Sequence, residues 1–399
     1  MANTSANKVL FISHEASRSG APIVLLHLLK WIKKNTSLQF EILLLTSGPL
    51  RADFEQLGKT FLLSELTGGH TYPARIKRKL LKTSLDDQYK KAVDDLAKRG
   101  YDLIYGNTIV TLPWLKIFKA DHRAKTLCCI HELSYVLNYF FTGEYLTENL
   151  NNVDTIIAVS KAVRENLINN YNVATEKIEL QYEFIDTGSM PVIKDLKRED
   201  LGITADEFII GMGGTPEWRK GTDLLIPLVL KLLELYPDFK FKLVWLGGGK
   251  EDGFVNQLLY DAQKCGIENK LLFIESNAAP LDFISLFDVF VLLSREDPFP
   301  LIALEAAFLK KPVIAFENSG GIPELINEGA GLLAPYLDIT QLAKQVYKLR
   351  SEKDLLNKMA GTANKLIVSK YSSAIVPPNI YGLIEKLINA PYKTVSPVN

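Results

Sequence analysis

The sequence predicts an α/β protein in which two doubly wound parallel sheets follow one another along the chain. Short apolar runs alternate with segments whose apolar residues recur at helical spacing, which is typical of parallel strands joined by helices on both faces of a sheet. This alternation restarts after residue 200. The stretch 184–200 between the two halves is polar and contains Gly188 and Pro191, so we expect the linker there.

The expected elements follow in order. The first half opens with a buried strand over 9–13 and a helix over 20–34, whose Pro22 lies in the first turn, where proline is tolerated. Its further strands are expected over 40–45, 102–105, 126–130 and 155–159. In the second half, a helix begins at about residue 222, and strands are expected over 208–212, 240–246, 271–274, 289–293 and 312–316.

These elements define the expected domains. We expect one domain over 1–185, a linker over 186–200 and a second domain over 201–375. The remaining residues, 376–399, contain Pro377 and Pro378 and then a helical pattern. The sequence thus predicts two α/β domains and a separate terminal helix.

The composition is that of a globular protein with enough apolar side chains for two cores, since 47% of the 399 residues are hydrophobic and 23% are charged. Basic and acidic residues number 46 each, so no overall field attracts nucleic acid, and we expect no such partner. The three cysteines include no CxxC pair, which argues against a disulfide framework or a zinc ribbon. No signal-peptide pattern and no run of about 18 apolar residues is present, which predicts a cytoplasmic protein.

Several familiar signatures are missing from the sequence. Gly211 and Gly213 are followed by Pro216 rather than by the third glycine of a dinucleotide fingerprint, and GGGK at 247–250 lacks the other residues of a P-loop. No GxSxG, HExxH or Asp-x-Asp motif is present, and all five histidines lie in the first half. We therefore expect neither a metal site nor a cofactor.

The segment 294–307, SREDPFPLIALEAA, follows an expected strand and opens a helix near Pro300. Backbone N–H groups at Leu301 and Ile302 would point out of the helix N-terminus, where they suit a phosphate. Glu305 lies further along, and an ionised carboxylate accepts hydrogen bonds from two neighbouring hydroxyls, as on a ribose. The alternative is an ordinary helix whose acidic N-terminal region complements its dipole.

Two more turns of the second half follow expected strands, at the edge where open α/β sheets bind ligands. GGTPEWRKGT at 213–222 contains Arg219 and Lys220, which bind phosphate as a bidentate fork and as a point charge. NSGGIPE at 318–324 contains Gly320 and Gly321, which allow the backbone to approach a ligand closely. The alternatives are a surface turn with solvated cations and an ordinary helix start.

Turns of the first half offer further candidates. The loop 17–22, with Gly20, is like an anion-facing loop, and Asn107 and His131 each follow an expected strand. A lone histidine is usually a satisfied structural residue, so its place at a strand's carboxyl end is what makes His131 a candidate. The run from Arg75 to Lys82 holds five basic residues; it is either a solvated face or a peripheral contact with anionic lipid at the inner membrane surface or with a partner.

Together these segments resemble glycosyltransferase family 4 (group 1), whose members have the GT-B architecture. The most specific part is the acid pair Asp297 and Glu305 with the following KKPVIAFENSGGIPEL, supported by SGAP at 19–22, IIAVSKAV at 156–163 and RKGTDLL at 219–225. The resemblance implies two Rossmann-like doubly wound domains facing each other across a cleft. It also implies that the C-terminal helix crosses back to the first domain.

The resemblance further implies a retaining, metal-independent transferase that moves a sugar from a nucleotide-diphosphate sugar to an acceptor, by default a glycan or a lipid-linked one in a polysaccharide pathway. Lys220 would contact the diphosphate, Asp297 the donor sugar and His131 the transferred sugar from the first domain. These three are the expected catalytic residues. The expected substrate-binding residues are Gly20, Asn107, Arg219, Glu296, Leu301, Ile302, Glu305, Gly320 and Gly321.

Three positions depart from the family pattern. Thr215 stands where the family has an arginine, Asp297 replaces a glutamate next to Glu296, and Pro300 replaces a glycine. Arg219 is a candidate for supplying the missing charge. These departures leave room for a non-catalytic sugar-nucleotide-binding or scaffold protein, and another enzyme of the same architecture, such as a sugar-nucleotide epimerase, is a further alternative.

Overall fold

The computed structural model describes residues 7–67, 87–122, 124–188, 194, 196–249, 251–275 and 279–390. The basic run Arg75–Lys82 lies outside the described residues. The chain forms two compact units. The first comprises Met1–Val159, Val163–Tyr182 and Ser373–Asn399, and the second comprises Ser160–Ala162 and Glu183–Ser372.

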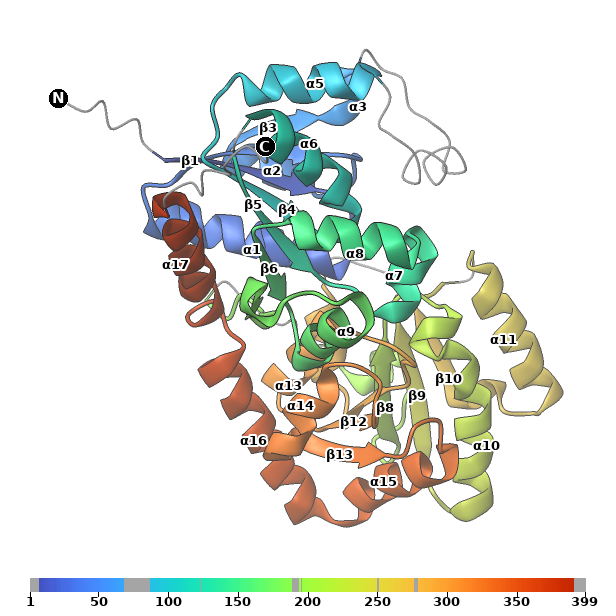
Figure 1. Ribbon diagram of the computed structural model, residues 1–399. Helices are drawn as coiled ribbons and strands as arrows, with labels where there is room; N and C mark the ends of the chain where they lie inside the picture. The colour runs from blue at the N-terminus through green and yellow to red at the C-terminus, as the bar shows by residue number, and fades with distance from the viewer. Residues whose placement is uncertain are drawn as a thin grey trace. The chain divides into compact units, whose positions relative to one another are not determined.

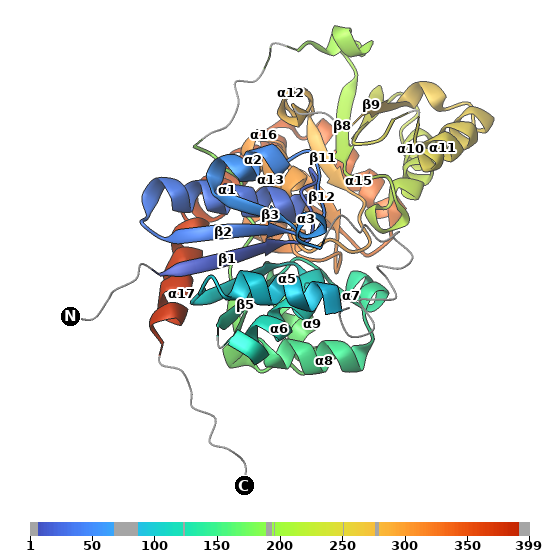
Figure 2. The ribbon, with the colours of Figure 1, turned by 90° about the horizontal axis from the view of Figure 1, so that it is seen from above.

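The first unit is built on a parallel sheet with the strand order β3-β2-β1-β4-β5-β6-β7 (Figures 1 and 2). Its strands are β1 Lys8–Ser13, β2 Gln39–Leu44, β3 Lys59–Leu62, β4 Leu103–Asn107, β5 Lys125–Ile130, β6 Thr155–Ala158 and β7 Ile178–Leu180. Its helices are α1 Gly20–Asn35, α2 Arg51–Leu57, α3 Leu63–Leu66, α5 Asp87–Ala97, α6 Leu112–His122, α7 Ser134–Phe140, α8 Gly143–Asn152, α9 Lys161–Tyr171 and α17 Val376–Asn389. The strand order reverses between β1 and β4, which is where a doubly wound sheet binds ligands.

The last helix, α17, belongs to the first unit. Two prolines open it at positions that need no intrahelical N–H bond. It packs beside α1, and the rings of Trp31 and Tyr381 approach each other at 6.1 Å between centroids (Figure 1). The buried stripe of α17 that includes Ile380 and Ile384 explains why this segment docks rather than staying in solvent.

The second unit repeats the architecture with the strand order β10-β9-β8-β11-β12-β13, all parallel. Its strands are β8 Phe208–Gly213, β9 Phe241–Leu246, β10 Leu271–Ile274, β11 Val289–Leu292, β12 Val313–Phe316 and β13 Gly331–Ala334. Its helices are α10 Leu225–Leu235, α11 Gly253–Lys264, α12 Pro280–Ser285, α13 Leu301–Phe308, α14 Ile322–Leu325, α15 Ile339–Ser351 and α16 Lys353–Lys370 (Figure 1). The order reverses between β8 and β11, so the turns after these two strands flank the ligand-binding position.

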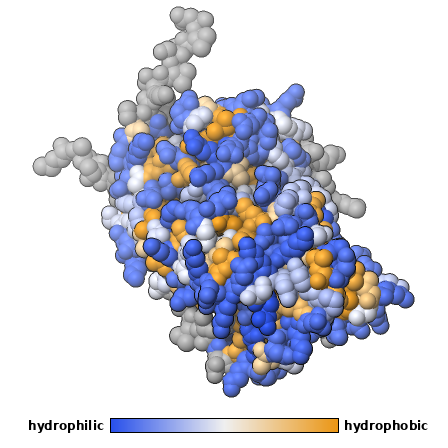
Figure 3. Space-filling model, turned by 90° about the horizontal axis from the view of Figure 1, so that it is seen from below, coloured by the Kyte–Doolittle hydropathy of each residue, from blue (hydrophilic) through white to orange (hydrophobic). Residues whose placement is uncertain are grey.

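The fold differs from the sequence prediction mainly at sheet edges. The strands β3, β7 and β13 were not predicted, and β4 continues to Asn107, which is therefore a strand residue rather than a turn residue. Residues 222–224 form a 3-10 turn, and the α-helix expected from about residue 222 begins at Leu225. In the described part of the chain, no helix is both long enough and apolar enough to span a membrane. The face drawn in Figure 3 mixes hydrophilic side chains with smaller apolar areas.

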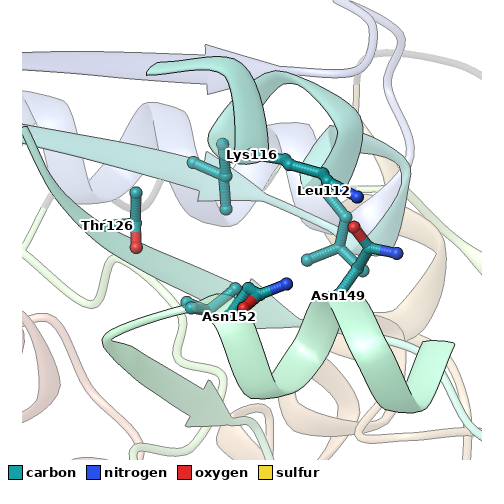
Figure 4. A pocket seen from close by; sticks show the side chains of 7 residues that line it. Leu112, Lys116, Thr126, Asn149 and Asn152 are labelled. Carbon is teal, nitrogen blue, oxygen red and sulfur yellow. The ribbon is translucent and has the colours of Figure 1, made fainter. Parts of the chain in front are cut away.

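Two cavities lie away from the switch points. Figure 4 shows one of about 10 Å³ between α6, β5 and α8, with Asn149 and Asn152 on one side of it and Leu112 and Lys116 on the other. It has room for about one water molecule and none for a sugar. The other, of about 280 Å³, lies at the opposite edge of the second sheet, where β8 begins at Phe208. Neither is therefore the candidate substrate site.

Candidate functional site

In the second unit, the turns that follow β8, β11 and β12 meet at the carboxyl edge of the sheet. The main chain of Asp297 forms a parallel bridge with Gly320: the N–H of Asp297 donates to Ser319 at 2.8 Å, and the N–H of Gly321 donates to Asp297 at 3.1 Å. Gly320 has φ +120°, and a Cβ there would lie 1.9 Å from the carbonyl oxygen of Asp297. The glycine pair thus permits close approach to Asp297, and a ligand contact of these glycines stays a prediction.

Lys220 and Asp297 form an ion pair at this junction. Nζ of Lys220 lies 2.6 Å from Oδ2 of Asp297, and Oγ of Ser294 donates to the same oxygen at 3.1 Å. Lys220 ends a 3-10 turn over Trp218–Lys220, and the next residue, Gly221, has φ +71°. A Cβ at Gly221 would lie 2.0 Å from the carbonyl oxygen of Leu293, so this turn sits directly against the end of β11. The sequence predicts both charged residues in one site but not their pairing.

Arg219 has contacts within the protein that the sequence did not reveal. Its Nη1 donates to the carbonyl oxygen of Glu296 at 2.9 Å, and its Nη2 donates to Oε1 of Glu217 at 2.7 Å. Glu296 therefore contributes its main-chain carbonyl group to this site, and its side chain is half-buried. A phosphate contact for Arg219 and a substrate contact for Glu296 stay predictions.

The start of α13 offers two backbone donors beside this pair. Within the described residues, the N–H groups of Leu301 and Ile302 have no hydrogen-bond acceptor, because the first bonds of the helix run from Ala303 and Leu304 to Pro300. The side chain of Ile302 lies against Gly213 at the end of β8, where a Cβ would come within 2.3 Å of it. The α13 N-terminus thus lies next to the turn that carries Lys220, and its free N–H groups suit an anion.

Glu305 lies one turn further along α13. Burial raises its pKa from the ordinary value of 4.5 to about 7, and in the described structure its carboxyl group has no hydrogen-bond or ion-pair partner. The Glu305 side chain is half-buried, and a partly desolvated carboxyl without a partner is unfavourable, so a hydroxyl-bearing ligand there would supply the missing hydrogen bonds. This agrees with the ribose contact expected for Glu305, which stays a prediction.

In the first unit, Asn107 connects the start of α1 with the end of β5. Its Nδ2 donates to the carbonyl oxygen of Ala21 at 3.0 Å, and its Oδ1 lies 3.0 Å from Nε2 of His131. The carbonyl of Ala21 fixes which end of the amide faces it, so Nε2 of His131 carries a proton and donates to Asn107. Gly20, next to Ala21, has open space where a Cβ would stand. The expected residues Gly20, Asn107 and His131 are thus neighbours at the β1–β4 switch point.

Three further charged residues lie near these turns and were not predicted as site residues. Glu132 is buried, which raises the pKa of its carboxyl, and it accepts hydrogen bonds from the N–H groups of His131 at 2.9 Å and Ile109 at 3.2 Å. Glu15 follows β1, and hydrogen bonds from His14 and Ser17 lower its pKa to about 2. Arg295 packs against Trp218. The sequence offered a signal for Glu132, next to His131, and for Arg295, which lies inside the segment 294–307.

The described residues contain no group of three or more His, Cys, Asp or Glu side chains that could hold a metal ion. The charged groups of the second unit's site are instead Lys220, Arg219, Arg295 and the acids that pair with them. The arrangement suits the binding of an anion whose other end carries hydroxyl groups.

Family models match both halves of the chain. The model of the group 1 glycosyl transferases matches residues 193–366, and that of glycosyltransferase family 4 matches residues 18–189. The chain belongs to the family 4 (group 1) glycosyltransferases. A Bacillus subtilis relative, YtcC, which bears the name of a glycosyltransferase, is 26% identical over 72% of this chain and 73% of its own. The D-inositol 3-phosphate glycosyltransferase of Corynebacterium kroppenstedtii is 24% identical over 51% of this chain and 47% of its own.

Solved structures share the fold of this family member over nearly its whole length. Anabaena HepE in complex with UDP-glucose has a TM-score of 0.77 and 21% identity, covering 95% of this chain and 99% of that one. Sucrose-phosphate synthase from Thermosynechococcus elongatus has a TM-score of 0.79 and 18% identity, covering 96% and 100%. The GT-B fold class expected from the sequence is confirmed.

Proposed function

We propose that this glycosyltransferase takes a sugar from a nucleotide-diphosphate sugar bound to its second unit and transfers it to a glycan or lipid-linked acceptor. The observation that carries the proposal is the juxtaposition of the Lys220–Asp297 pair with the free N–H groups at the start of α13. Glu305, one turn further, offers a carboxyl group to the ribose. The complexes of HepE with UDP-glucose and with UDP support a nucleotide-sugar donor.

Charge development explains why these groups would matter to the chemistry. When the bond between the sugar and the diphosphate breaks, negative charge grows on the β-phosphate. Lys220 and the N–H groups of Leu301 and Ile302 would stabilise that charge from fixed positions, so no reorganisation is needed at the moment of reaction. The proposal assigns this task to protein groups and requires no metal ion in the donor site.

Retention of the anomeric configuration is part of the proposal. The acceptor would attack from the face that the diphosphate leaves, and the departing phosphate would accept the acceptor's proton. Asp297 would meet hydroxyls of the donor sugar, and His131, held by Asn107, would position the transferred sugar. The steric course is tested by measuring the anomeric configuration of the product by NMR.

Turnover of purified protein with a panel of nucleotide sugars tests the proposal. Lys220→Met should lower turnover by about 10²- to 10³-fold, as expected for loss of a charge that stabilises the transition state. The matched control is Lys231→Met, which removes a half-buried surface lysine of α10 that pairs with Glu234. Near-normal turnover of Lys220→Met would reject the assignment. Conversion of the donor to an epimer without any acceptor would instead support an epimerase, and loss of activity in EDTA that added magnesium restores would reject metal independence.

A further inference from the structure

We propose that Arg295 is a positioning residue that holds Lys220 in place for the donor diphosphate; this inference rests on the proposed function. Arg295 acts as half of an arginine clasp, which we define as the reciprocal contacts of Arg219 and Arg295 between the turn Trp218–Lys220 and the segment 295–297. The sequence predicts a substrate contact for Arg219 and no role for Arg295.

Each arginine of the clasp donates to the main chain of the other segment. Nη1 of Arg219 lies 2.9 Å from the carbonyl oxygen of Glu296, and Nη1 of Arg295 lies 2.5 Å from that of Trp218. The N–H of Arg295 also donates to the carbonyl oxygen of Arg219 at 2.8 Å. Lys220 and Asp297, the next residues of the two segments, form the neighbouring contact. The contacts of the two arginines therefore fix where the ammonium group of Lys220 lies.

The turn that carries Lys220 depends on these contacts. It is a single 3-10 turn without a side-chain cap, closed by hydrogen bonds from Lys220 to Glu217 at 3.1 Å and from Gly221 to Trp218 at 3.0 Å. One such turn has poor hydrogen-bond geometry and little stability of its own. Its orientation therefore depends on its neighbours: Gly221 lies against Leu293, Thr222 bonds to Glu217, and the segment 295–297 supplies the arginine contacts.

Arg295 ties the same turn to the following helix. Its guanidinium forms two parallel bonds with the carboxylate of Asp223, at 2.8 and 2.7 Å, and Asp223 lies in the turn that leads into α10. The ring of Trp218 covers the guanidinium at 4.5 Å, and the side chain of Arg295 is only 10% exposed. These contacts direct the guanidinium at protein groups, so Arg295 acts on the donor through Lys220 rather than by touching it.

The substitution Arg295→Lys separates this role from a simple charge effect. Lysine keeps the positive charge but cannot form the two parallel bonds to Asp223. We expect Arg295→Lys to raise the Kd for UDP and to lower kcat/KM by about tenfold each, in keeping with the loss of charge-assisted bonds that orient a ligand group. The matched control is Arg350→Lys, an exposed arginine at the end of α15, which should behave as wild type.

A double-mutant cycle with Lys220→Met, followed by UDP binding, decides between positioning and general destabilisation. If the clasp works through Lys220, Arg295→Lys has no further effect on the UDP Kd of Lys220→Met. Asp223→Asn removes the same paired bonds from the other side and should reproduce Arg295→Lys, and it replaces that variant if circular dichroism shows Arg295→Lys to be unfolded.

The outcomes separate the two proposals. Wild-type turnover of Lys220→Met would overturn the proposed function. A damaged Lys220→Met together with wild-type values for Arg295→Lys and Asp223→Asn would overturn the clasp alone. The clasp would also be overturned if Arg295→Lys changed the UDP Kd equally in the wild type and in Lys220→Met.

Discussion

The ammonium nitrogen of Lys220 lies 2.6 Å from Oδ2 of Asp297, although the two residues are 77 positions apart in the sequence. Their side chains are only 15% and 5% exposed. Removing one partner of such a pair leaves the other charge poorly compensated. Asp297 therefore neutralises part of the positive charge that Lys220 would offer to a diphosphate.

Substitution of Asp297 should consequently separate binding from catalysis. Asp297→Asn removes the charge that competes for Lys220, so the UDP Kd should fall by about three- to tenfold, roughly the strength of one charge-assisted bond. Turnover should fall by about 10²-fold, because the contact with the donor sugar is lost. Calorimetry and initial rates measure the two effects. As a control, Asp206→Asn breaks an exposed pair with Lys240 and should change neither; weaker UDP binding by Asp297→Asn would contradict the account.

Glu305 should make stability depend on pH. Its pKa is about 7 in the folded protein against an ordinary 4.5, so between these values the folded state binds more protons than the unfolded state. Stability from this group is thus present below pH 4.5 and is lost as pH rises through about 7. Glu305→Gln removes the titration, so the variant should gain stability relative to wild type from pH 5 to pH 7. Urea unfolding at several pH values measures this; a pH-independent difference between the two proteins would refute it.

His131 depends on Asn107, which accepts a hydrogen bond from its ring at 3.0 Å. Asn107→Leu should leave the fold intact and lower turnover by about 10- to 100-fold through misplacement of the imidazole. Nitrogen NMR of labelled histidine should show Nε2 of His131 protonated in the wild type and an altered signal in the variant. Asn35→Leu, at the exposed end of α1, is the control. An unchanged His131 signal in Asn107→Leu would show that the contact does not hold the ring.

Two glycines of the second unit should respond in opposite directions to alanine. Gly320→Ala puts a Cβ 1.9 Å from the carbonyl oxygen of Asp297 at φ +120°, so it should destabilise the protein by about 1–3 kcal/mol and displace Asp297. Gly361→Ala lies in α16 with open space around the added carbon, and it should stabilise by about 0.5–1 kcal/mol. Thermal unfolding measures both. Equal stability of Gly320→Ala and wild type would mean that the Asp297–Gly320 bridge can open without cost.

The sequence predicted the parallel sheets and the turns in which the site lies, because central strands such as β1 and β8 are continuous apolar runs. The strands β3, β7 and β13 are short and only partly buried, so they lack that signal. Local patterns of this kind predict which residues follow the carboxyl ends of the strands. Open α/β sheets bind ligands at that edge, so the patterns also predict where the site lies.

Contacts between distant segments could not be predicted in the same way. Asp297 and Glu296, which Lys220 and Arg219 contact, each lie 77 residues away. Only the packed turns show that both arginines bond to carbonyl groups of the other segment and that Arg295 also pairs with Asp223. Glu132 was adjacent to a predicted residue, yet its role became visible only through its burial and its two backbone donors. Spacing in the sequence shows where residues lie along the chain. Their roles here depend on which hydrogen-bond donors and acceptors the fold brings together.

A crystal structure of the protein with bound nucleoside diphosphate tests the central claim most directly. The ligand should be the diphosphate among UDP, GDP and ADP that gives the largest thermal shift, since a ligand stabilises the state that it binds. We expect its β-phosphate within hydrogen-bond distance of Nζ of Lys220 and of the N–H of Leu301 or Ile302, with the ribose at Glu305. A diphosphate bound elsewhere, for example in the cavity at the opposite edge of the second sheet, would contradict the account.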